Sequence, residues 1–266
     1  MVAEIGILGG SGLYELLSDA DEHTIGTPYG APSDAIVTGT FAGRDVAFLP
    51  RHGRGHPFPP HRINYRANLW ALHSLGVRRL VTPCAVGSLR ADITPGTFVV
   101  LDQVVDRTSG RPDTYFDGPV VTHVSLADPY CPELRSVAVS ALAELGIPFR
   151  DGGTNVVIQG PRFSTRAESR WFTSMGWHVV GMTQYPEIAL ARELECCTVG
   201  VALVTDFDVG LEHLPDVPPV SAAEILETFQ ANLANLRRLL EDLVPRIPRE
   251  RSCPCGSALE GARVTS

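Results

Sequence analysis

The stretch Ile5-Gly-Ile-Leu-Gly-Gly-Ser-Gly-Leu13 decides how the rest of the chain is interpreted. It begins as a short apolar run and then breaks into glycines, which predicts a buried first strand that runs into a tight loop. Glycines allow positive φ and bring free backbone N–H groups close to an anion, and the Ser11 hydroxyl adds a donor at the same place. The sequence therefore predicts an anion-binding loop here, with a plain turn as the alternative.

This loop does not match the dinucleotide-binding fingerprint. Gly10-Ser-Gly12 is followed by Leu13, Tyr14 and Glu15, so no third glycine stands where that motif requires one. The loop by itself gives no sign of a dinucleotide cofactor.

The composition is that of an ordinary globular protein with an acidic balance. The 266 residues are 44% hydrophobic and 20% charged, which fits one large α/β domain or two small ones. A net charge of −8 argues against a nucleic acid or an anionic membrane as a general partner. The N-terminus shows no leader pattern and no apolar run reaches about 18 residues, so we expect a cytoplasmic protein.

The cysteines are too sparse for a disulfide framework in a chain of this length. They are Cys84, Cys131, Cys196, Cys197, Cys253 and Cys255. No two pairs have the spacing of a zinc knuckle, so we expect no metal site, and most of these thiols should be buried as small hydrophobic side chains. Cys253-Pro-Cys255 lies in a polar tail, and either a solvated tail or a redox clip or staple fits that segment.

Strand and helix patterns alternate along the chain. After the first strand, strands are predicted at 34–40, 45–49, 79–84, 97–105, 154–159, 178–182 and 198–206, and helices at 63–75, 133–145, 166–175, 186–194 and 221–243. Because parallel strands need crossover connections, this order predicts a single α/β domain with a mixed, mostly parallel central sheet and helices on both faces. The domain would span residues 1–245, followed by a C-terminal tail at 246–266. Residues 106–130 form a long polar excursion, which is typical of a functional loop.

Ligands of open α/β sheets gather at the carboxyl ends of the strands. The side chains and amides that this chain places after its predicted strands are those of Ser11, Arg51, His52, His56, Ala85, Phe163, Met182, Thr183, Asp206 and Asp208. Together they offer a fixed cation, imidazoles, hydroxyls, free amides, an aromatic face and two carboxylates.

Each of these groups also has an ordinary structural explanation. Arg51 could form a surface ion pair, and His52 and His56 could be packed or solvated. A guanidinium beside histidines at a strand end is nevertheless well suited to phosphate, because its fork of donors matches the phosphate oxygens.

The aromatic and acidic groups have similar alternatives. Phe163 could belong to the core, although a ring beside a loop of Gly, Pro and Arg would also stack on a planar base. Asp206 and Asp208 stand two residues apart in an extended segment, so both would reach one ligand, whereas a cap or turn role is the other explanation.

A phosphate clamp, a stacking ring and a carboxylate pair point to one kind of reaction. The sequence shows no metal-ligand set and no Ser-His-Asp arrangement, which leaves phosphate as the nucleophile and a leaving group that needs a proton. A purine nucleoside meets both demands. Phosphate would attack C1′ while a carboxyl group protonates N7 of the departing base.

A series of short motifs carries a family resemblance that runs from Ile5 to about Pro245. They are Gly9-Gly-Ser-Gly12, Thr27-Pro-Tyr-Gly-Ala-Pro-Ser33, Arg51-His-Gly-Arg-Gly-His56, Asn64-Tyr-Arg-Ala-Asn68, Asp106-Arg-Thr108, Gln159-Gly-Pro-Arg-Phe-Ser164, Arg166-Ala-Glu-Ser169 and Gly181-Met-Thr183 with Pro186-Glu187. Together they resemble the methylthioadenosine phosphorylase branch of the trimeric purine nucleoside phosphorylases.

The resemblance implies a role for each site residue. Phosphate would be held by Ser11, Arg51, His52, the Ala85 amide and Thr183. Phe163 would stack on the base, Met182 would touch the ribose, and His56 would belong to the same substrate pocket. Asp206 and Asp208 would bond N7 and the 6-amino group, which favours adenine, because relatives that act on 6-oxopurines carry asparagine at the position of Asp206.

The resemblance also implies a homotrimer, or a hexamer made of two trimers, in which His123 lines the 5′ pocket of a neighbouring subunit. Some positions depart from the animal enzymes of this branch: Cys84 replaces threonine, Gly181 replaces asparagine, and Ala222 and Ile225 replace valines. The Cys253-Pro-Cys255 ending is similar to one found in some heat-adapted relatives, which favours a disulfide there.

These expectations combine into one function. The chain would carry out the phosphorolysis of 5′-methylthioadenosine in purine and methionine salvage, with nucleoside and phosphate as its small-molecule partners and no metal or organic cofactor. A broader purine or methylthioinosine phosphorylase is the nearest alternative. A nucleotide-sensing module without catalysis is the alternative from another class.

Overall fold

The computed structural model describes residues 3–10, 17–211 and 222–264. Its strands are β1 (Ile5–Gly9), β2 (Ser18–His23), β3 (Ile36–Phe41), β4 (Arg44–Pro50), β5 (Arg79–Ser88), β6 (Phe98–Val100), β7 (Gln103–Arg107), β8 (Phe149–Asp151), β9 (Thr154–Ile158), β10 (Val179–Gly181) and β11 (Cys197–Phe207). Its helices are α1 (Tyr65–Ser74), α2 (Pro132–Glu144), α3 (Arg166–Ser174), α4 (Gln184–Glu193) and α5 (Ala222–Arg246), with the short 3-10 helices η2 (Pro60–Arg62) and η3 (Pro254–Ser257). The predicted alternation of strands and helices is confirmed.

The strands form one mixed sheet, which confirms the predicted α/β class. Its main path has the order β2-β3-β4-β1-β5-β10-β9-β7, while β11 pairs with β5 and β6, and β8 pairs with β6. The parallel pairs are β1–β4, β1–β5, β5–β11, β9–β10, β7–β9 and β6–β8, and they outnumber the antiparallel pairs. The apolar residues that open this chain therefore form a fully buried strand between β4 and β5.

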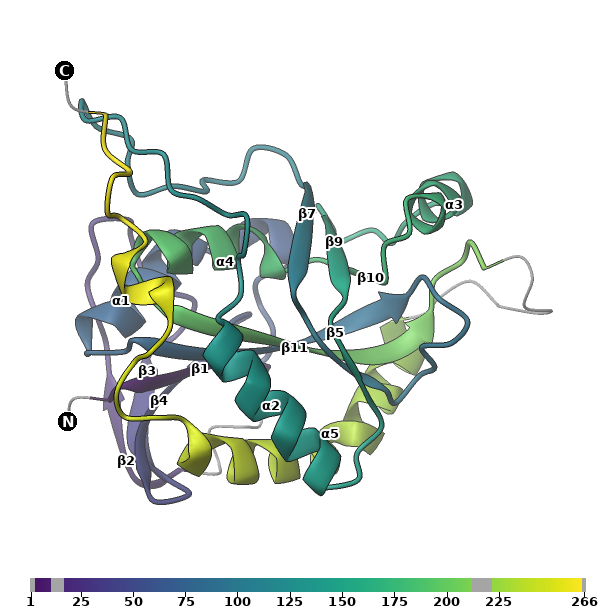
Figure 1. The fold of residues 1–266 in the computed structure, drawn as a ribbon, viewed down its shortest axis with the longest axis horizontal. Helices are drawn as coiled ribbons and strands as arrows, with labels where there is room; N and C mark the ends of the chain where they lie inside the picture. Colours follow the sequence, from purple (N-terminus) through teal and green to yellow (C-terminus); the bar gives the residue numbers. More distant parts are fainter. Residues whose placement is uncertain (1–2, 11–16, 212–221, 265–266) are drawn as a thin grey trace.

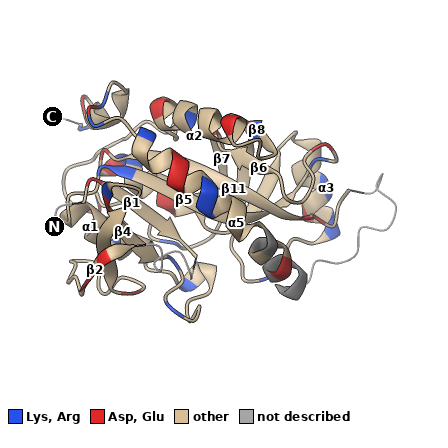
Figure 2. Ribbon diagram, turned by 90° about the horizontal axis from the view of Figure 1, so that it is seen from below, with Lys and Arg blue, Asp and Glu red and all other residues tan. Residues whose placement is uncertain are grey.

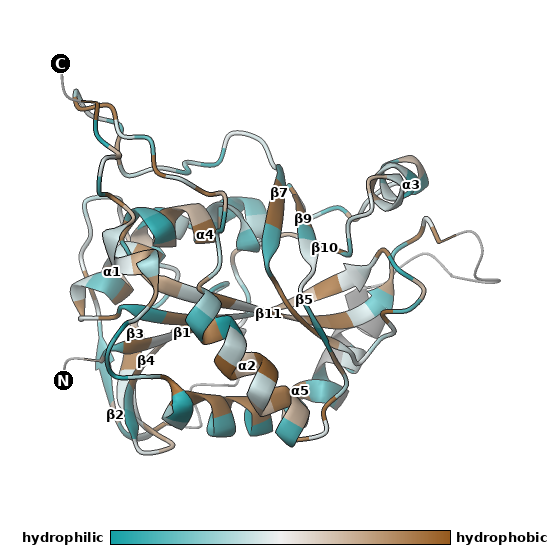
Figure 3. Ribbon diagram, viewed as in Figure 1, coloured by the Kyte–Doolittle hydropathy of each residue, from teal (hydrophilic) through white to brown (hydrophobic). Residues whose placement is uncertain are grey.

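Helices cover both faces of the sheet, as predicted (Figure 1). On one face, leucines and alanines of α2 and α5 pack against strand residues such as Phe98 and Val201. On the other face, α1 and α4 pack through Leu69, Leu72 and Leu190. Hydrophobic segments appear in the central strands and in α2 and α5 (Figure 3), and charged residues are spaced along α2 and α5 (Figure 2). Each of these four helices thus buries an apolar stripe against the sheet.

The sheet opens along one edge of β5. Residues 79–81 of β5 pair with β1 and residues 87–88 pair with β10, whereas β11 lines the other edge along the whole strand. In the described part of the chain, residues 82–86 have no strand partner on the β1 and β10 side. The strands β1 and β10 thus leave an unpaired stretch of β5 between them, and we call this opening the fork. Open α/β sheets bind ligands at such a point.

The sequence missed two strands and merged two others. The strand β2 has the polar sequence SDADEH and is almost entirely exposed at the edge of the sheet, so it lacks the apolar alternation that marks a strand. The three-residue β8 was missed because it is so short. The predicted strand 97–105 is two strands, because the chain changes neighbours at Leu101 and Asp102: β6 pairs with β11, and β7 pairs with β9.

The C-terminal tail packs on the body of the protein, so the solvated-tail interpretation is wrong. Ile247 and Cys255 are buried in the hydrophobic cluster beneath α2 and α5. Farther on, Arg263 forms a bridge with Thr122, and the Val264 N–H donates to the Val121 carbonyl. Figure 1 shows this pair of segments projecting together beside the C-terminus, and we call residues 119–126 and 261–264 the arm.

Among the helices of the described residues, none combines the length and the apolar character needed to cross a bilayer. The expectation that most cysteines are buried is confirmed, since only Cys253 is partly exposed.

Candidate active site

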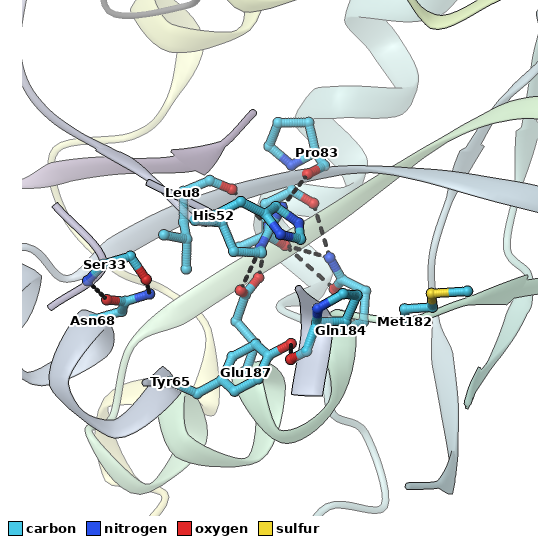
Figure 4. A network of polar contacts seen from close by, with 12 residues as sticks. Leu8, Ser33, His52, Tyr65, Asn68, Pro83, Met182, Gln184 and Glu187 are labelled. Atoms are coloured by element: carbon cyan, nitrogen blue, oxygen red, sulfur yellow. Dashed lines mark hydrogen bonds and ion pairs between the residues drawn. The ribbon is translucent and has the colours of Figure 1, made fainter. Parts of the chain in front are cut away.

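Arg51 lies inside the fork between β1 and β5, with an exposed fraction of only 3%. Its Nη2 donates to the Leu8 carbonyl at 2.7 Å and its Nη1 to the Pro83 carbonyl at 3.0 Å. Nε and Nη2 also donate to the two carboxylate oxygens of Glu187 on α4, at 2.7 and 2.9 Å. Figure 4 labels Leu8, Pro83 and Glu187 in this network of polar contacts.

This pairing decides the charge balance of the fork. A surface ion pair was the alternative for Arg51, and that interpretation is wrong, because its partner Glu187 is also 1% exposed. Burial works against the charge of Arg51, but Glu187 outweighs that effect and raises the pKa of the guanidinium. Burial also raises the pKa of Glu187, and Arg51 offsets part of that rise. One Nη1 hydrogen of Arg51 is left without an acceptor among the described residues and is available to a ligand.

His52 is neutral at physiological pH. Its Nδ1 lies 2.8 Å from the Phe58 carbonyl, which can only accept, so Nδ1 carries the proton and Nε2 keeps its lone pair. Burial lowers the pKa of His52 to about 4, and the charges of Arg51 and His56 act in the same direction. The His56 ring stacks on it with centroids 4.0 Å apart. The pair therefore offers an acceptor and a flat surface rather than a second cation.

Ala85 is exposed although both of its neighbours in β5 are buried. A central strand is normally covered on both faces, so this exposure marks an opening above the strand. Gly87 points to the same side of the sheet as Ala85, because it stands two residues further along. The absence of a side chain at Gly87 matters here, since a Cβ would come within 3.1 Å of Asp206 Oδ2 and 3.3 Å of Val180.

The two aspartates after β11 lie together, as predicted from their spacing. Asp206 is in register with Gly87, after a bulge that follows Val204. A Cβ on Gly87 would also be 3.6 Å from the Asp208 Cβ, so both side chains flank the same glycine. Along β5 the carbonyl of Pro83 that binds Arg51 is four residues away, which is about 13 Å. The acidic end and the cationic end of the site are thus joined by one strand.

The two carboxylates have different surroundings. Asp206 is half-buried and accepts a hydrogen bond from the Thr205 hydroxyl at 2.7 Å. Asp208 is 3% exposed, and both of its oxygens lie 2.7 Å from the hydroxyl of Ser164. Asp208 is therefore held in place, whereas Asp206 is the more accessible acid.

Phe163 precedes Ser164 in the loop after β9, so the bond from Ser164 to Asp208 brings its backbone to the acidic end of the site. The ring is 37% exposed, and the interpretation of Phe163 as a core residue is wrong. Upstream, Gly160 adopts a φ of +62°, and a Cβ there would meet Met182 Sδ at 2.7 Å. The ends of β9 and β10 are thus packed against each other through Gly160 and Met182.

Thr183 is the N-cap of α4 and is buried, yet its side chain makes no capping hydrogen bond. The next residue, Gln184, donates to the Thr82 carbonyl at 3.0 Å and accepts from the Tyr130 hydroxyl at 3.1 Å. Figure 4 shows Gln184 within this network of polar contacts, with Met182 to one side. The start of α4 therefore meets the open edge of β5, with the Thr183 hydroxyl not committed to capping its own helix.

Comparisons with known proteins identify this arrangement. The model of the phosphorylase superfamily matches residues 4–245. The chain belongs to the phosphorylase superfamily. It is 56% identical to a purine nucleoside phosphorylase of Streptomyces coelicolor, over 97% of this chain and 95% of that protein. It is also 54% identical to an S-methyl-5′-thioadenosine phosphorylase of Mycolicibacterium smegmatis, over 94% of this chain and 93% of that protein.

A solved structure shows the same fold in this superfamily. The crystal structure of a methylthioadenosine phosphorylase from an antarctic soil metagenomic library superposes with a TM-score of 0.92 at 42% identity, and the match covers 100% of this chain and 93% of that one. The chain is therefore an enzyme, a pentosyltransferase with a nucleoside phosphorylase fold.

The phosphorylase contains an arginine at this site that the sequence analysis missed. Arg111 comes from the long polar segment before α2 and is buried. Its guanidinium donates to the carbonyls of Gln159, Met182 and Tyr185, at 2.7, 2.9 and 2.6 Å. It therefore fastens the ends of β9 and β10 to the start of α4. A single arginine in a polar loop carries no local pattern that could have revealed this.

One predicted residue, His123, is not brought to this site by the single phosphorylase chain. It is exposed on the arm, where its backbone N–H donates to the Ala262 carbonyl at 2.8 Å, and Figure 1 shows the arm far from the ends of β5 and β11. Ser11 lies outside the described residues, and so do the side chains of Ala222 and Ile225.

Proposed function

We propose that this phosphorylase cleaves S-methyl-5′-thioadenosine with inorganic phosphate and releases adenine and 5-methylthioribose 1-phosphate. The observation that carries the proposal is the placement of Asp206 and Asp208 beside the same residue, Gly87, at the open end of β5. The relatives from Mycolicibacterium smegmatis and from antarctic soil bear this activity in their names.

The carboxylate pair supports an aminopurine as the leaving group. In the proposed reaction a phosphate oxygen bonds to C1′ while the bond from C1′ to N9 breaks, and its electron pair enters the purine ring. Asp206, the more accessible acid, would give a proton to N7. Asp208, held by Ser164, would accept a hydrogen bond from the 6-amino group.

The cationic end supports phosphate as the co-substrate, with no metal or organic cofactor in the reaction. We assign phosphate binding to Ser11, Arg51, His52, the Ala85 amide and Thr183. Because Glu187 balances most of the charge of Arg51, binding here would depend on directed hydrogen bonds more than on net charge. The neutral Nε2 of His52 fits the protonated oxygen of a phosphate monoanion or dianion.

The remaining site residues would complete the nucleoside pocket. Phe163 would stack on the base, and Met182 and His56 would line the ribose side. His123 would come from a neighbouring subunit of a homotrimer or of a hexamer made of two trimers. The exposed position of His123 on the arm supports this, as do the exposed apolar side chains of the arm, which are those of Val120, Val121, Leu126 and Val264. Within this proposal the catalytic domain is residues 1–245, the tail at 246–266 braces it, and the cytoplasmic location stays a prediction.

The decisive experiment compares substrates. We expect phosphate-dependent release of adenine from methylthioadenosine to be faster than base release from inosine or methylthioinosine, measured as kcat/KM. The identity of 56% to a purine nucleoside phosphorylase favours a broader enzyme as the second candidate, and faster cleavage of inosine would establish that alternative. Binding of adenosine without any base release would point instead to a nucleotide-sensing module.

A further inference from the structure

Four cysteines from three separate parts of the chain meet at one point. Cys131 is the N-cap residue of α2 and Cys197 is the first residue of β11, while Cys253 and Cys255 flank the start of η3 in the tail. Their Sγ atoms all lie within 4.8 Å of one another, and those of Cys197 and Cys253 are 3.3 Å apart. Three of the four side chains are buried and Cys253 is partly exposed.

The spacing of the sulfurs fits a tetrahedral metal ion. In a site with four thiolates at about 2.3 Å from zinc, neighbouring sulfurs are about 3.8 Å apart. A disulfide would require a separation of about 2.0 Å, and it would link the sulfurs only in pairs. Here each sulfur is close to all three others, which is the arrangement that a single central ion needs.

A buried arginine at the cluster supplies an independent argument. Arg79 is fully buried, and its Nη1 lies 3.5 Å from Cys197 Sγ. Its Nε finds no hydrogen-bond partner in the part of the chain that the structure describes. The acid nearest to it in an ion pair is Glu4, at 3.9 Å, and that side chain is 40% exposed. A buried guanidinium is costly unless negative charge lies beside it. Neutral disulfides would not provide that charge, whereas four thiolates around a divalent ion carry a net charge of −2.

We propose that Cys131, Cys197, Cys253 and Cys255 bind one Zn²⁺ ion and that Arg79 partly neutralises the resulting thiolate cluster. On binding, the four thiols release their protons to solvent and form four bonds from sulfur to zinc, with no change of oxidation state. All four positions of the ion are filled by protein ligands, so the site is structural and holds no substrate. It also lies at the opposite end of β11 from Asp206, about 30 Å away along the strand.

The ion would fasten the tail to the body of the protein. The ligands Cys253 and Cys255 belong to the tail, whereas Cys131 lies at the start of α2 and Cys197 lies in the sheet. Beyond the cluster, the tail continues to the arm, where Ala262 and Val264 bond to His123 and Val121. Zinc would therefore stabilise the segment that carries His123, although it takes no part in the chemistry.

The test is the metal content and the thiol state of the full-length protein. We expect the protein, purified under reducing conditions and freed of loosely bound metal on a chelating resin, to contain about one zinc per chain by elemental mass spectrometry. Titration of the metal-free protein with Co²⁺ should give the visible absorption of a tetrahedral cobalt thiolate. Cys253→Ser and Cys255→Ser should lose the ion and the cobalt spectrum, with a lowered thermal midpoint.

A matched control stands next to one of the ligands. Cys196 is buried like Cys197, but its sulfur faces the carbonyls of Val77 and Leu194 instead of the cluster. Cys196→Ala should therefore keep the zinc and the cobalt spectrum. Loss of both in this variant would show that they depend on general packing, and that result would count against the proposal.

Other outcomes would overturn it directly. A chain without zinc whose metal-free form gives no cobalt thiolate spectrum would do so without any variant. So would two free thiols instead of six in the denatured, non-reduced protein, because the four clustered cysteines would then be disulfides. Iron in place of zinc would contradict the identity of the ion.

Discussion

At one end of the β5–β11 pair, Arg79 lies in register with Cys197, and at the other end Gly87 lies in register with Asp206. The first end is closed: the arginine is fully buried and faces sulfur. The second end is open, since Ala85 and Gly87 leave space above the strand. The same two strands thus provide a packed polar cluster at one end and accessible acids at the other.

The two buried arginines sharpen this comparison. Arg51 has a buried carboxylate, Glu187, as its partner, so its charge is balanced within the protein. Among the described residues, Arg79 pairs with no buried carboxylate, since Glu4 is 40% exposed, and the cysteine cluster is the charge proposed to balance it. A buried positive charge is stable only beside a negative charge. Glu187 supplies that charge at Arg51, and the proposed thiolates would supply it at Arg79.

The largest effect is expected at the open end. Asp206→Asn removes the proposed proton donor to N7 but keeps the shape of the side chain, so adenine release from methylthioadenosine should fall by about 10²- to 10⁴-fold in kcat. Steady-state kinetics with saturating phosphate would measure this. The exposed Asp92, changed to Asn, should leave kcat unaltered. An unchanged rate in Asp206→Asn would remove the acid from the proposed mechanism.

Breaking the ion pair in the fork should cost the most stability. Arg51→Met leaves Glu187 buried without a partner, and the free energy of unfolding should fall by about 3–5 kcal/mol. The double variant Arg51→Met with Glu187→Met removes both charges and should recover part of that loss. Urea unfolding of the two variants would measure the difference. Equal losses in both would mean that the unpaired charge of Glu187 is not the cause of the loss.

The matching change at the closed end should affect metal rather than catalysis. Arg79→Met removes the positive charge beside the thiolates, so the affinity for Zn²⁺ should fall by about 10- to 100-fold, as for other residues that support metal ligands. Competition with a chromogenic chelator would measure the affinity. The kcat of the zinc-loaded variant should stay near that of the unchanged enzyme. An unaltered zinc affinity would show that Arg79 does not balance the cluster.

The smallest effect concerns pH. The pKa of His52 is about 4 in the folded protein and about 6.5 in an unfolded chain. Between these values the unfolded chain binds more protons, so His52 makes stability fall as the pH drops from 6.5 towards 4. In His52→Gln, which can still donate to the Phe58 carbonyl, the thermal midpoint should change less between pH 7 and pH 5. An identical pH dependence in both proteins would contradict the assigned shift.

The sequence predicted most of the fold because the central strands and the helices have strong apolar patterns. It failed for β2, whose polar residues pair only at the sheet edge, and for the break at Leu101, which depends on which strands lie beside it. It placed Asp206 and Asp208 together because a spacing of two residues is local information. Chain spacing could not reveal the cysteine cluster, since its members come from three distant segments that meet only after β11 and the tail have packed.

The same limit explains the residues of the site that were missed. Glu187 stood in a quoted motif, but its role follows from burial beside Arg51, and burial cannot be seen in a motif. Arg111 acts on three carbonyls that belong to distant segments. His123 was recognised only by resemblance, and the single chain leaves it exposed.

The bridge between Thr122 and Arg263 joins the middle of the chain to its far end. Contacts between such distant positions form late, because the intervening strands and helices must first bring the two segments together. The arm is therefore expected to close at the end of folding and to open first when the tail is clipped by a protease. Trimming the tail would then remove the contacts that hold the segment around His123, which the proposed trimer requires, while leaving the central sheet of each chain intact.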